Sequence, residues 1–317
     1  MGKPIGLFFL GAAFVLSWSS GFVGAKLGTG DAPVPTVLMW RFLPAAAVLV
    51  TVLAVRGGPW LTARSTGRHV VVGLLSQATY LLTVYGAIGL GVSTGTTALI
   101  DGVQPLVAAA LVGPLLGLAV TGRQWVGLAL GLVGVAAVTW ADASAPATSA
   151  PAAAYALPFL GMLGLVASTI LERRAPERVP PLTALTVHCA TSAVVLTGLA
   201  VATGTAVPPA TPSFWVATAW LVVLPTVGGY GLYWVLVERI GVTAVNGLMF
   251  LIAPVTAVWG ALMFGEPFTL ATAAGLALAL AAAATVSRPT GRRSRTAPAE
   301  PSCPASPARS AGATRRR

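Results

Sequence analysis

Ten long apolar runs constrain the fold of this 317-residue chain more than any other feature. Each is close to the roughly 17–25 residues that a helix needs to cross the hydrocarbon core of a bilayer. The runs are continuous and lack the residue-by-residue alternation of a membrane β-barrel. We therefore expect an all-α integral membrane protein with ten transmembrane helices. The runs cover residues 5–25, 35–55, 70–88, 92–117, 125–140, 153–172, 181–203, 213–237, 242–264 and 268–287.

The composition excludes the water-soluble classes of protein. Only 9% of the residues are charged and 56% are hydrophobic, whereas about 25% are charged in an average soluble domain. A soluble protein of this size needs a charged surface to stay in solution. The two cysteines, Cys189 and Cys303, form no metal-binding or disulfide pattern. We expect neither a metal nor another cofactor.

The basic residues predict the orientation of the chain, because Lys and Arg accumulate on the cytoplasmic side of membrane proteins. Placing the N-terminus in the cytoplasm puts seventeen of the 19 Lys and Arg residues on that side. We therefore expect a protein of the plasma membrane with both termini in the cytoplasm. The net charge of +11 then indicates contact with anionic lipid more than with nucleic acid, and we expect no nucleic-acid partner.

The two halves of the chain repeat each other. Phe9-Leu10-Gly11 matches Phe159-Leu160-Gly161, and Pro105 matches Pro254 at an offset of 149. Each half holds five predicted crossings, and because five is odd the second half enters the membrane inverted. Inverted repeats around a central cavity are typical of secondary transporters. We predict a first repeat over 1–140, a linker over 141–152, a second repeat over 153–287 and a disordered basic cytoplasmic tail over 288–317.

Several short motifs occur in an order that resembles the drug/metabolite transporter superfamily, specifically proteins with two EamA domains, over roughly residues 7–286. The resemblance implies ten helices around a cavity and transport, often export, of amino acids, metabolites or drugs. The first half reads Leu116-Gly117-Leu118 where the repeat of Gly265-Glu266 is expected, so it lacks that acid. The motifs are Ser17-Trp18-Ser19-Ser20-Gly21-Phe22-Val23, Lys26-Leu27-Gly28, Trp40-Arg41-Phe42, Pro105-Leu106-Val107, Ala253-Pro254-Val255 and Gly265-Glu266-Pro267-Phe268-Thr269.

Two charged residues lie deep in predicted membrane helices. Asp101 is about 14 Å and Arg41 about 9 Å from the outer end of its run, at 1.5 Å per residue. An ionised Asp at such depth costs about 2.5–3.5 kcal/mol, so Asp101 is either a proton or cation site or a structural partner, with Arg41 as a candidate. Arg41 could instead hold a substrate carboxylate or extend to the membrane surface.

Pro105 and Pro254 are predicted to break their helices at equivalent positions of the two halves, because proline removes a backbone hydrogen bond. Matched breaks indicate a binding cavity, although each proline alone could be a packing kink. His188 aligns with Arg41 and is the only histidine inside a predicted run. It could relay protons, but a lone buried histidine more often forms a hydrogen bond with the backbone of a neighbouring residue.

Eight other polar or amphipathic side chains lie inside the predicted helices. Lipid offers them no hydrogen-bond partner, so we expect some to face the bundle interior and line the cavity. The aromatic ones could equally pack in the core or at the membrane interface. Glu266, at the outer end of the ninth run, is expected to be solvated. The eight are Trp18, Gln77, Tyr80, Tyr85, Gln104, Tyr230, Tyr233 and Asn246.

The sequence favours a secondary transporter, and specifically an exporter of a small metabolite, amino acid or drug by alternating access, with proton coupling as an open alternative. The chain contains no GxxxxGK[ST] motif for an ATP-driven pump. The other classes are a membrane scaffold or receptor and an intramembrane enzyme. Gly91-Val92-Ser93-Thr94-Gly95 matches a hydrolase motif but lacks the preceding strand and a His–acid pair. The expected partners are a small-molecule substrate, the bilayer and, if flux is coupled, protons; the oligomeric state stays open.

Overall fold

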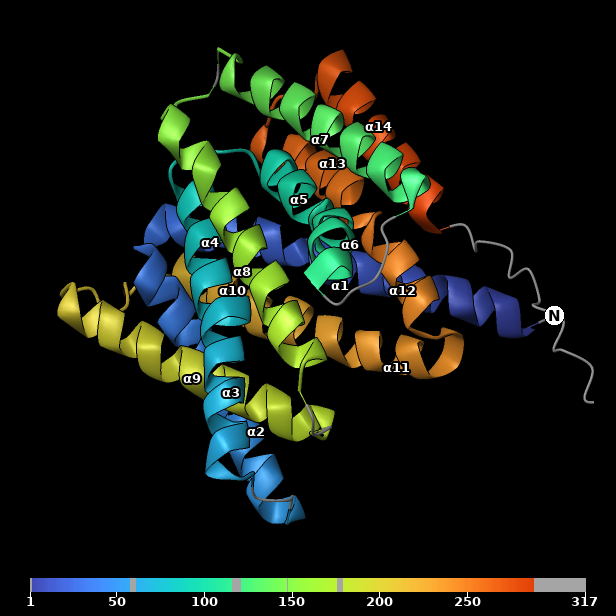
Figure 1. Cartoon of the computed structure of the whole chain (residues 1–317). Coiled ribbons are helices and arrows are strands. Elements are labelled where there is room, and N and C mark those ends of the chain that lie inside the picture. Colours follow the sequence, from blue (N-terminus) through green and yellow to red (C-terminus); the bar gives the residue numbers. More distant parts are fainter. Residues whose placement is uncertain (1, 58–60, 116–120, 147, 176–178, 288–317) are drawn as a thin grey trace, which may run out of the picture. The chain divides into compact units, whose positions relative to one another are not determined.

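The computed structural model describes residues 2–57, 61–115, 121–146, 148–175 and 179–287, and these residues form helices joined by loops, with no strand among them (Figure 1). Two expectations lie outside the described residues, namely the disordered tail over 288–317 and the missing acid at Leu116-Gly117-Leu118. The predicted all-helical class is confirmed for the described part of the chain.

The helices follow the predicted runs closely. In the first half they are α1 (Gly2–Asp31), α2 (Val34–Arg56), α3 (Ala63–Gly73), η1 (Leu74–Thr79), α4 (Tyr80–Gly89), α5 (Thr94–Gly102), α6 (Gln104–Leu115) and α7 (Gly122–Ala143). In the second half they are η2 (Ala152–Tyr155), α8 (Ala156–Arg173), α9 (Pro181–Ala202), α10 (Pro212–Leu221), η3 (Val222–Gly229), α11 (Tyr230–Ile240), α12 (Val242–Met249), α13 (Ile252–Phe264) and α14 (Leu270–Ser287).

Eight helical segments of the described chain are long and apolar enough to cross a membrane. They coincide with eight of the ten predicted runs. The fourth run is divided into α5 and α6, and the tenth is α14, whose apolar stretch Leu270–Ala282 is shorter. The chain is therefore a multi-pass membrane protein.

Two π-helical segments, η1 and η3, interrupt long helices. They lie at equivalent positions of the two halves, since a shift by the repeat offset of 149 places Leu74–Thr79 on residues 223–228, within η3. In η3, Pro225 has no backbone N–H to donate, and the Thr226 hydroxyl donates to the carbonyl of Leu221 at 2.9 Å. Such wide turns occur frequently at functional sites. Hydrophobic periodicity gives no sign of them, and sequence reasoning did not predict them.

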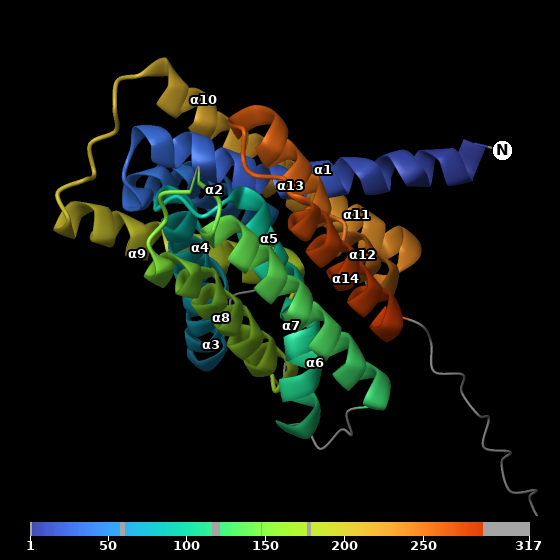
Figure 2. The same ribbon diagram turned by 90° about the horizontal axis from the view of Figure 1, so that it is seen from above.

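Two helices of the first half pack against their counterparts in the second, α2 against α9 and α7 against α14, and α5 packs against α13 (Figures 1 and 2). Glycine permits the closest approaches, as is common between membrane helices. A Cβ on Gly134 would lie 2.7 Å from the Gly275 carbonyl oxygen, and a Cβ on Gly275 would lie 2.7 Å from the Gly134 carbonyl oxygen. The remaining large contacts join α1 to α10, η3 and α13, and α4 to α8.

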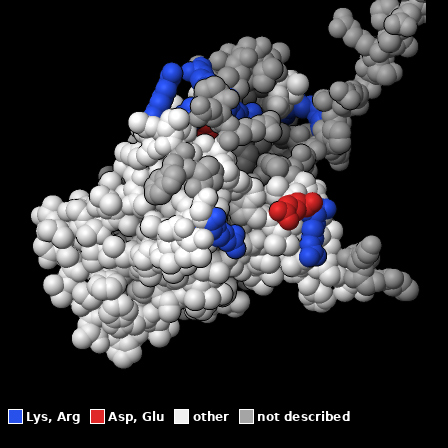
Figure 3. All heavy atoms as spheres, turned by 90° about the horizontal axis from the view of Figure 1, so that it is seen from below, with Lys and Arg blue, Asp and Glu red and all other residues white. Residues whose placement is uncertain are grey.

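The outer surface carries large apolar side chains that a soluble protein would bury. Val194 on α9 and Leu262 on α13 are 73% and 80% exposed. Figure 3 shows one face on which uncharged atoms cover wide areas and charged side chains are few. Lipid is a suitable surrounding for such a surface, because no hydrogen bonds are lost there.

Candidate functional site

A cavity of about 220 Å³ lies between helices of the two halves. Small-molecule sites for drug-sized ligands usually measure about 300–1,000 Å³, so this cavity suits a smaller solute. Residues of α1, α2, η1, α4, α5 and α6 line it from the first half, and residues of α8, η3, α11, α12 and α13 line it from the second.

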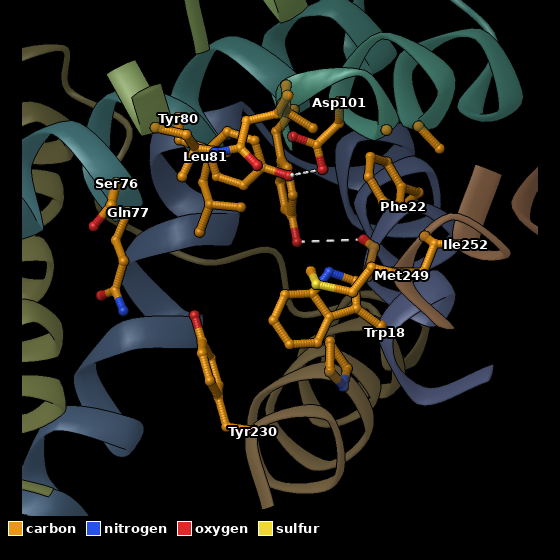
Figure 4. A pocket seen from close by; sticks show the side chains of 18 of the residues that line it. Trp18, Phe22, Ser76, Gln77, Tyr80, Leu81, Asp101, Tyr230, Met249 and Ile252 are labelled. Atoms are coloured by element: carbon orange, nitrogen blue, oxygen red, sulfur yellow. Dashed lines mark hydrogen bonds between the residues drawn. The ribbon is translucent and has the colours of Figure 1, made fainter. Parts of the chain in front are cut away.

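The structure brings most of the predicted site residues together around this cavity. Figure 4 shows Trp18, Gln77, Tyr80, Asp101 and Tyr230 around one space. Three further predicted residues, His188, Asn246 and Pro254, are not among the residues that line it, and Asn246 is exposed. The predicted residues that line the cavity are Trp18, Arg41, Gln77, Tyr80, Tyr85, Asp101, Gln104, Pro105 and Tyr230.

The two predicted helix breaks are present. The first is at Val103, between α5 and α6, one residue after Gly102 and two before Pro105. The second is at Phe250 and Leu251, between α12 and α13, three residues before Pro254. Gly102, Pro105, Met249 and Phe250 line the cavity, so both breaks adjoin it.

Asp101 is held by a hydroxyl rather than by a charge. The Tyr80 hydroxyl donates to Asp101 Oδ2 at 2.9 Å (Figure 4), while Asp101 Oδ1 is buried without a hydrogen-bond partner. The hydrogen bonds of Arg41 go to Tyr85 and Thr226 and not to this carboxyl group. Arg41, the candidate structural partner, is therefore not the partner of Asp101, and the carboxyl group keeps an acceptor oxygen for a proton or a cationic ligand.

Arg41 is buried but has neutral partners. Its Nη1 donates to the Tyr85 hydroxyl at 2.5 Å and its Nε donates to Thr226 Oγ1 at 3.3 Å. Thr226 belongs to η3 of the second half, so the π-helical segment helps to hold an arginine of the first half. A guanidinium has five N–H donors and keeps its charge at any physiological pH. The arrangement can therefore bind an anionic group at the cavity wall.

Aromatic rings form one side of the cavity. The ring centroids of Trp18 and Tyr230 are 5.5 Å apart in an edge-to-face arrangement. Behind them, Trp18 packs on Phe14 and on Tyr233 at centroid distances of 5.5 and 6.3 Å. Tyr233 is thus a packing residue, as the alternative interpretation of the aromatics allowed. Such a wall offers both apolar contact and a π face for a ligand cation.

His188 has a partner that sequence reasoning missed. His69 Nδ1 lies 3.2 Å from His188 Nε2, and both rings are buried. Helix α3 begins at Ala63, seven residues before the predicted run, and this brings His69 into a membrane helix. The approach is close because Gly73 has no side chain: a Cβ there would lie 2.9 Å from the His188 Cα. The prediction that His188 is a lone histidine with a hydrogen bond to a neighbour's backbone is therefore wrong.

Glu266 is buried rather than solvated, which corrects a second expectation. It accepts from Lys26 Nζ at 2.6 Å, from the Thr94 backbone N–H at 2.9 Å and from the Thr94 hydroxyl at 2.7 Å. Thr94 is the first residue of α5, so the carboxylate satisfies the start of that helix. Lys26 and Glu266 both stand in motifs of the sequence, but nothing in the sequence placed them together. We name the Lys26–Glu266–Thr94 contacts the Lys26–Glu266 latch.

Asp142 at the end of α7 has a similar role that sequence reasoning did not find. It accepts from the Ser93 backbone N–H at 3.1 Å and from the Tyr155 hydroxyl at 3.2 Å. Ser93 itself caps α5, since its side chain accepts from the Thr96 N–H. The serine of the hydrolase-like motif is thus a helix cap.

Comparison with known proteins agrees with this geometry. A model of the EamA-like transporter family matches residues 5–140 and again residues 152–288. A solved structure, titled only as the crystal structure of a protein, is similar in fold with a TM-score of 0.59 at 20% identity, over 88% of this chain and 96% of that chain. No curated protein matches the chain. The double match confirms that the chain is built from two related halves.

Proposed function

Because the chain belongs to the EamA-like transporter family, we propose that it is a secondary transporter that exports a small zwitterionic or amphipathic solute, such as an amino acid, by alternating access. Members of this family are transporters rather than enzymes. In this proposal the protein lies in the plasma membrane with ten crossings and both termini in the cytoplasm.

The observation that carries the proposal is the pair of opposite charges in one small cavity. Arg41 and Asp101 both line it, each held by neutral side chains and not by the other. A zwitterion supplies the missing partner to both, with its carboxylate on Arg41 and its ammonium group on Asp101. A scaffold or receptor needs no such pair at depth, where each unpaired charge is costly.

The packing of the helices supports the inverted repeat on which alternating access depends. Two of the most extensive helix contacts pair a helix with its own counterpart, α2 with α9 and α7 with α14. A twofold relation between the halves produces this pattern. The breaks near Pro105 and Pro254 place helix ends beside the cavity, as in other transporters that rock their halves around a fixed site.

Transport itself is tested by flux measurements on protein reconstituted into liposomes, with amino acids, sugars and cationic drugs, each with and without a pH gradient. We expect zwitterionic amino acids to give the highest flux. Gln104→Trp places a bulky side chain in a 220 Å³ cavity and is expected to remove most of that flux. The matched control is Val126→Trp, since Val126 is 55% exposed on α7. Equal flux in both variants would contradict the cavity as the route.

Arg41→Gln is expected to weaken binding of solutes that carry a carboxylate and to spare neutral ones. A hydrogen bond to a charged group contributes about 1.5–3 kcal/mol, which corresponds to a rise of about 10- to 100-fold in KM. The measurement is the ratio of kcat/KM for a zwitterion and a neutral solute of similar size. Arg239→Gln, at an exposed position of α11, is the control. An equal loss for both solutes would make Arg41 a structural residue.

A further inference from the structure

A second and larger hollow lies away from the central cavity, between α2, α3 and α9. It measures about 940 Å³ and is lined mainly by apolar side chains. None of the residues that line it also lines the central cavity. We name it the α2–α3–α9 groove; its walls include Val50 and Leu53 of α2, Val70 of α3 with Leu74 at the start of η1, and Val187 and Val194 of α9.

The groove is open to the surroundings of the helices. Val50 and Val194 on opposite walls are 48% and 73% exposed. Along α9 the groove runs from Thr186 to Val195, a length of about 14 Å at 1.5 Å per residue. This is about half of the roughly 30 Å hydrocarbon core, which is the depth of one leaflet. An apolar groove of this length in the side of a membrane protein fits an acyl chain.

One end of the groove is basic. Gly57 and Thr66 line that end; Arg56 ends α2 and Arg64 lies in the first turn of α3, and both side chains are exposed. Arg68 follows one turn later on α3, and its Nε and Nη2 atoms are buried without a hydrogen-bond partner.

No acidic side chain on these helices balances the three arginines, because α2, α3 and α9 contain no Asp or Glu. Basic sites between membrane helices on the cytoplasmic side select anionic lipid headgroups. A second copy of the chain, docked on the groove about a twofold axis, would bring two such clusters toward each other, and like charges repel.

We propose that the α2–α3–α9 groove is a binding site for an anionic phospholipid. Its acyl chain lies between Val50, Leu74 and Val194, and its phosphate is bound by Arg56 and Arg64. The occupant is a lipid of the leaflet that faces the basic end. It differs from the transported solute in place and in chemistry, so its binding is measurable in the absence of any flux.

The test is native mass spectrometry of the full chain in detergent, titrated with phosphatidylglycerol or with phosphatidylcholine of the same chain length. We expect one phosphatidylglycerol to be retained per chain and phosphatidylcholine to bind more weakly. In Arg56→Gln/Arg64→Gln, the apparent Kd for phosphatidylglycerol is expected to rise about 30-fold, which corresponds to about 1 kcal/mol per arginine. Arg239→Gln, at an exposed position outside the groove, is expected to bind as the wild type does.

A second variant tests the apolar part of the site. Ala190→Trp fills the groove and is expected to reduce retention of both lipids, whereas Val216→Trp, 64% exposed on α10, is not. Glycerol phosphate, which carries the headgroup charge without acyl chains, is expected not to displace the lipid. The proposal is overturned if the charge variants retain phosphatidylglycerol as the wild type does, if Ala190→Trp retains it equally, if glycerol phosphate displaces it, or if the chain is a dimer that excludes lipid.

Discussion

Asp101→Asn is expected to abolish the accumulation of solute that a pH gradient drives, while downhill exchange of the solute continues at a higher KM, because a neutral amide binds the ammonium group more weakly than a carboxylate does. A gradient of one pH unit supplies about 1.4 kcal/mol per proton, enough for about tenfold accumulation. The asparagine keeps an oxygen that accepts from the Tyr80 hydroxyl, so the local hydrogen bond survives. What the variant loses is the group that can bind and release a proton. The measurement is solute accumulation in liposomes at imposed pH differences.

Tyr80→Phe is the matched control for this prediction. It removes the hydrogen bond to Asp101 Oδ2 and keeps the carboxyl group, so accumulation should still follow the pH gradient. If Asp101→Asn accumulated solute as the wild type does, with the fold intact by circular dichroism, Asp101 would not be the coupling group. It would then remain a candidate for the ammonium group of the solute.

Glu266→Ala is expected to destabilise the fold more than any other single change at a charged residue discussed above. Removing one partner of a buried ion pair lowers the free energy of unfolding by about 3–5 kcal/mol. We expect the lower end of this range because the Lys26 side chain is 29% exposed. The variant also leaves the Thr94 N–H at the start of α5 without its carboxylate. Chemical unfolding in detergent micelles, followed by circular dichroism, measures the change.

If the latch stabilises the fold through its opposite charges, the effect of changing Glu266 on the free energy of unfolding depends on whether Lys26 is present. Lys26→Met/Glu266→Met leaves no unpaired charge, so it should recover much of the lost free energy of unfolding. Glu238→Ala, at an exposed position of α11, should change it by less than about 0.5 kcal/mol. A Glu266→Ala protein as stable as the Glu238→Ala protein would show that the latch contributes nothing measurable.

The sequence predicted the helices well because their physical cause is local. A run of apolar residues in lipid must satisfy its backbone hydrogen bonds within itself, and a helix does so. The breaks at Val103 and at Phe250–Leu251 were equally predictable, since Pro105 and Pro254 remove hydrogen bonds wherever they stand in a helix. The start of α3 was placed too late, because the polar stretch that contains Arg64 and His69 carries no hydrophobic signal.

The partners of the polar residues were not predictable in the same way. Arg41 was a candidate partner for Asp101, but Asp101 lies against Tyr80; His188 lies against His69; and Glu266 is buried against Lys26. Each of the last two contacts joins residues more than one hundred positions apart. Each residue along an α-helix points its side chain about 100° further around the helix axis than the residue before it. The π-helical segments η1 and η3 change this angle locally, and no sequence pattern records the change.

Hydrophobicity and repetition are properties of the chain alone, and they were enough to predict a helical membrane protein with two related halves. Which charges share the central cavity, which glutamate is buried in the latch and where an apolar groove meets unbalanced arginines became known from the packing of the helices. The reason is physical: a polar atom in a membrane bundle is stabilised by whatever partner the packing brings within about 3 Å, and packing depends on helix rotation and close approach at glycines such as Gly73 and Gly134.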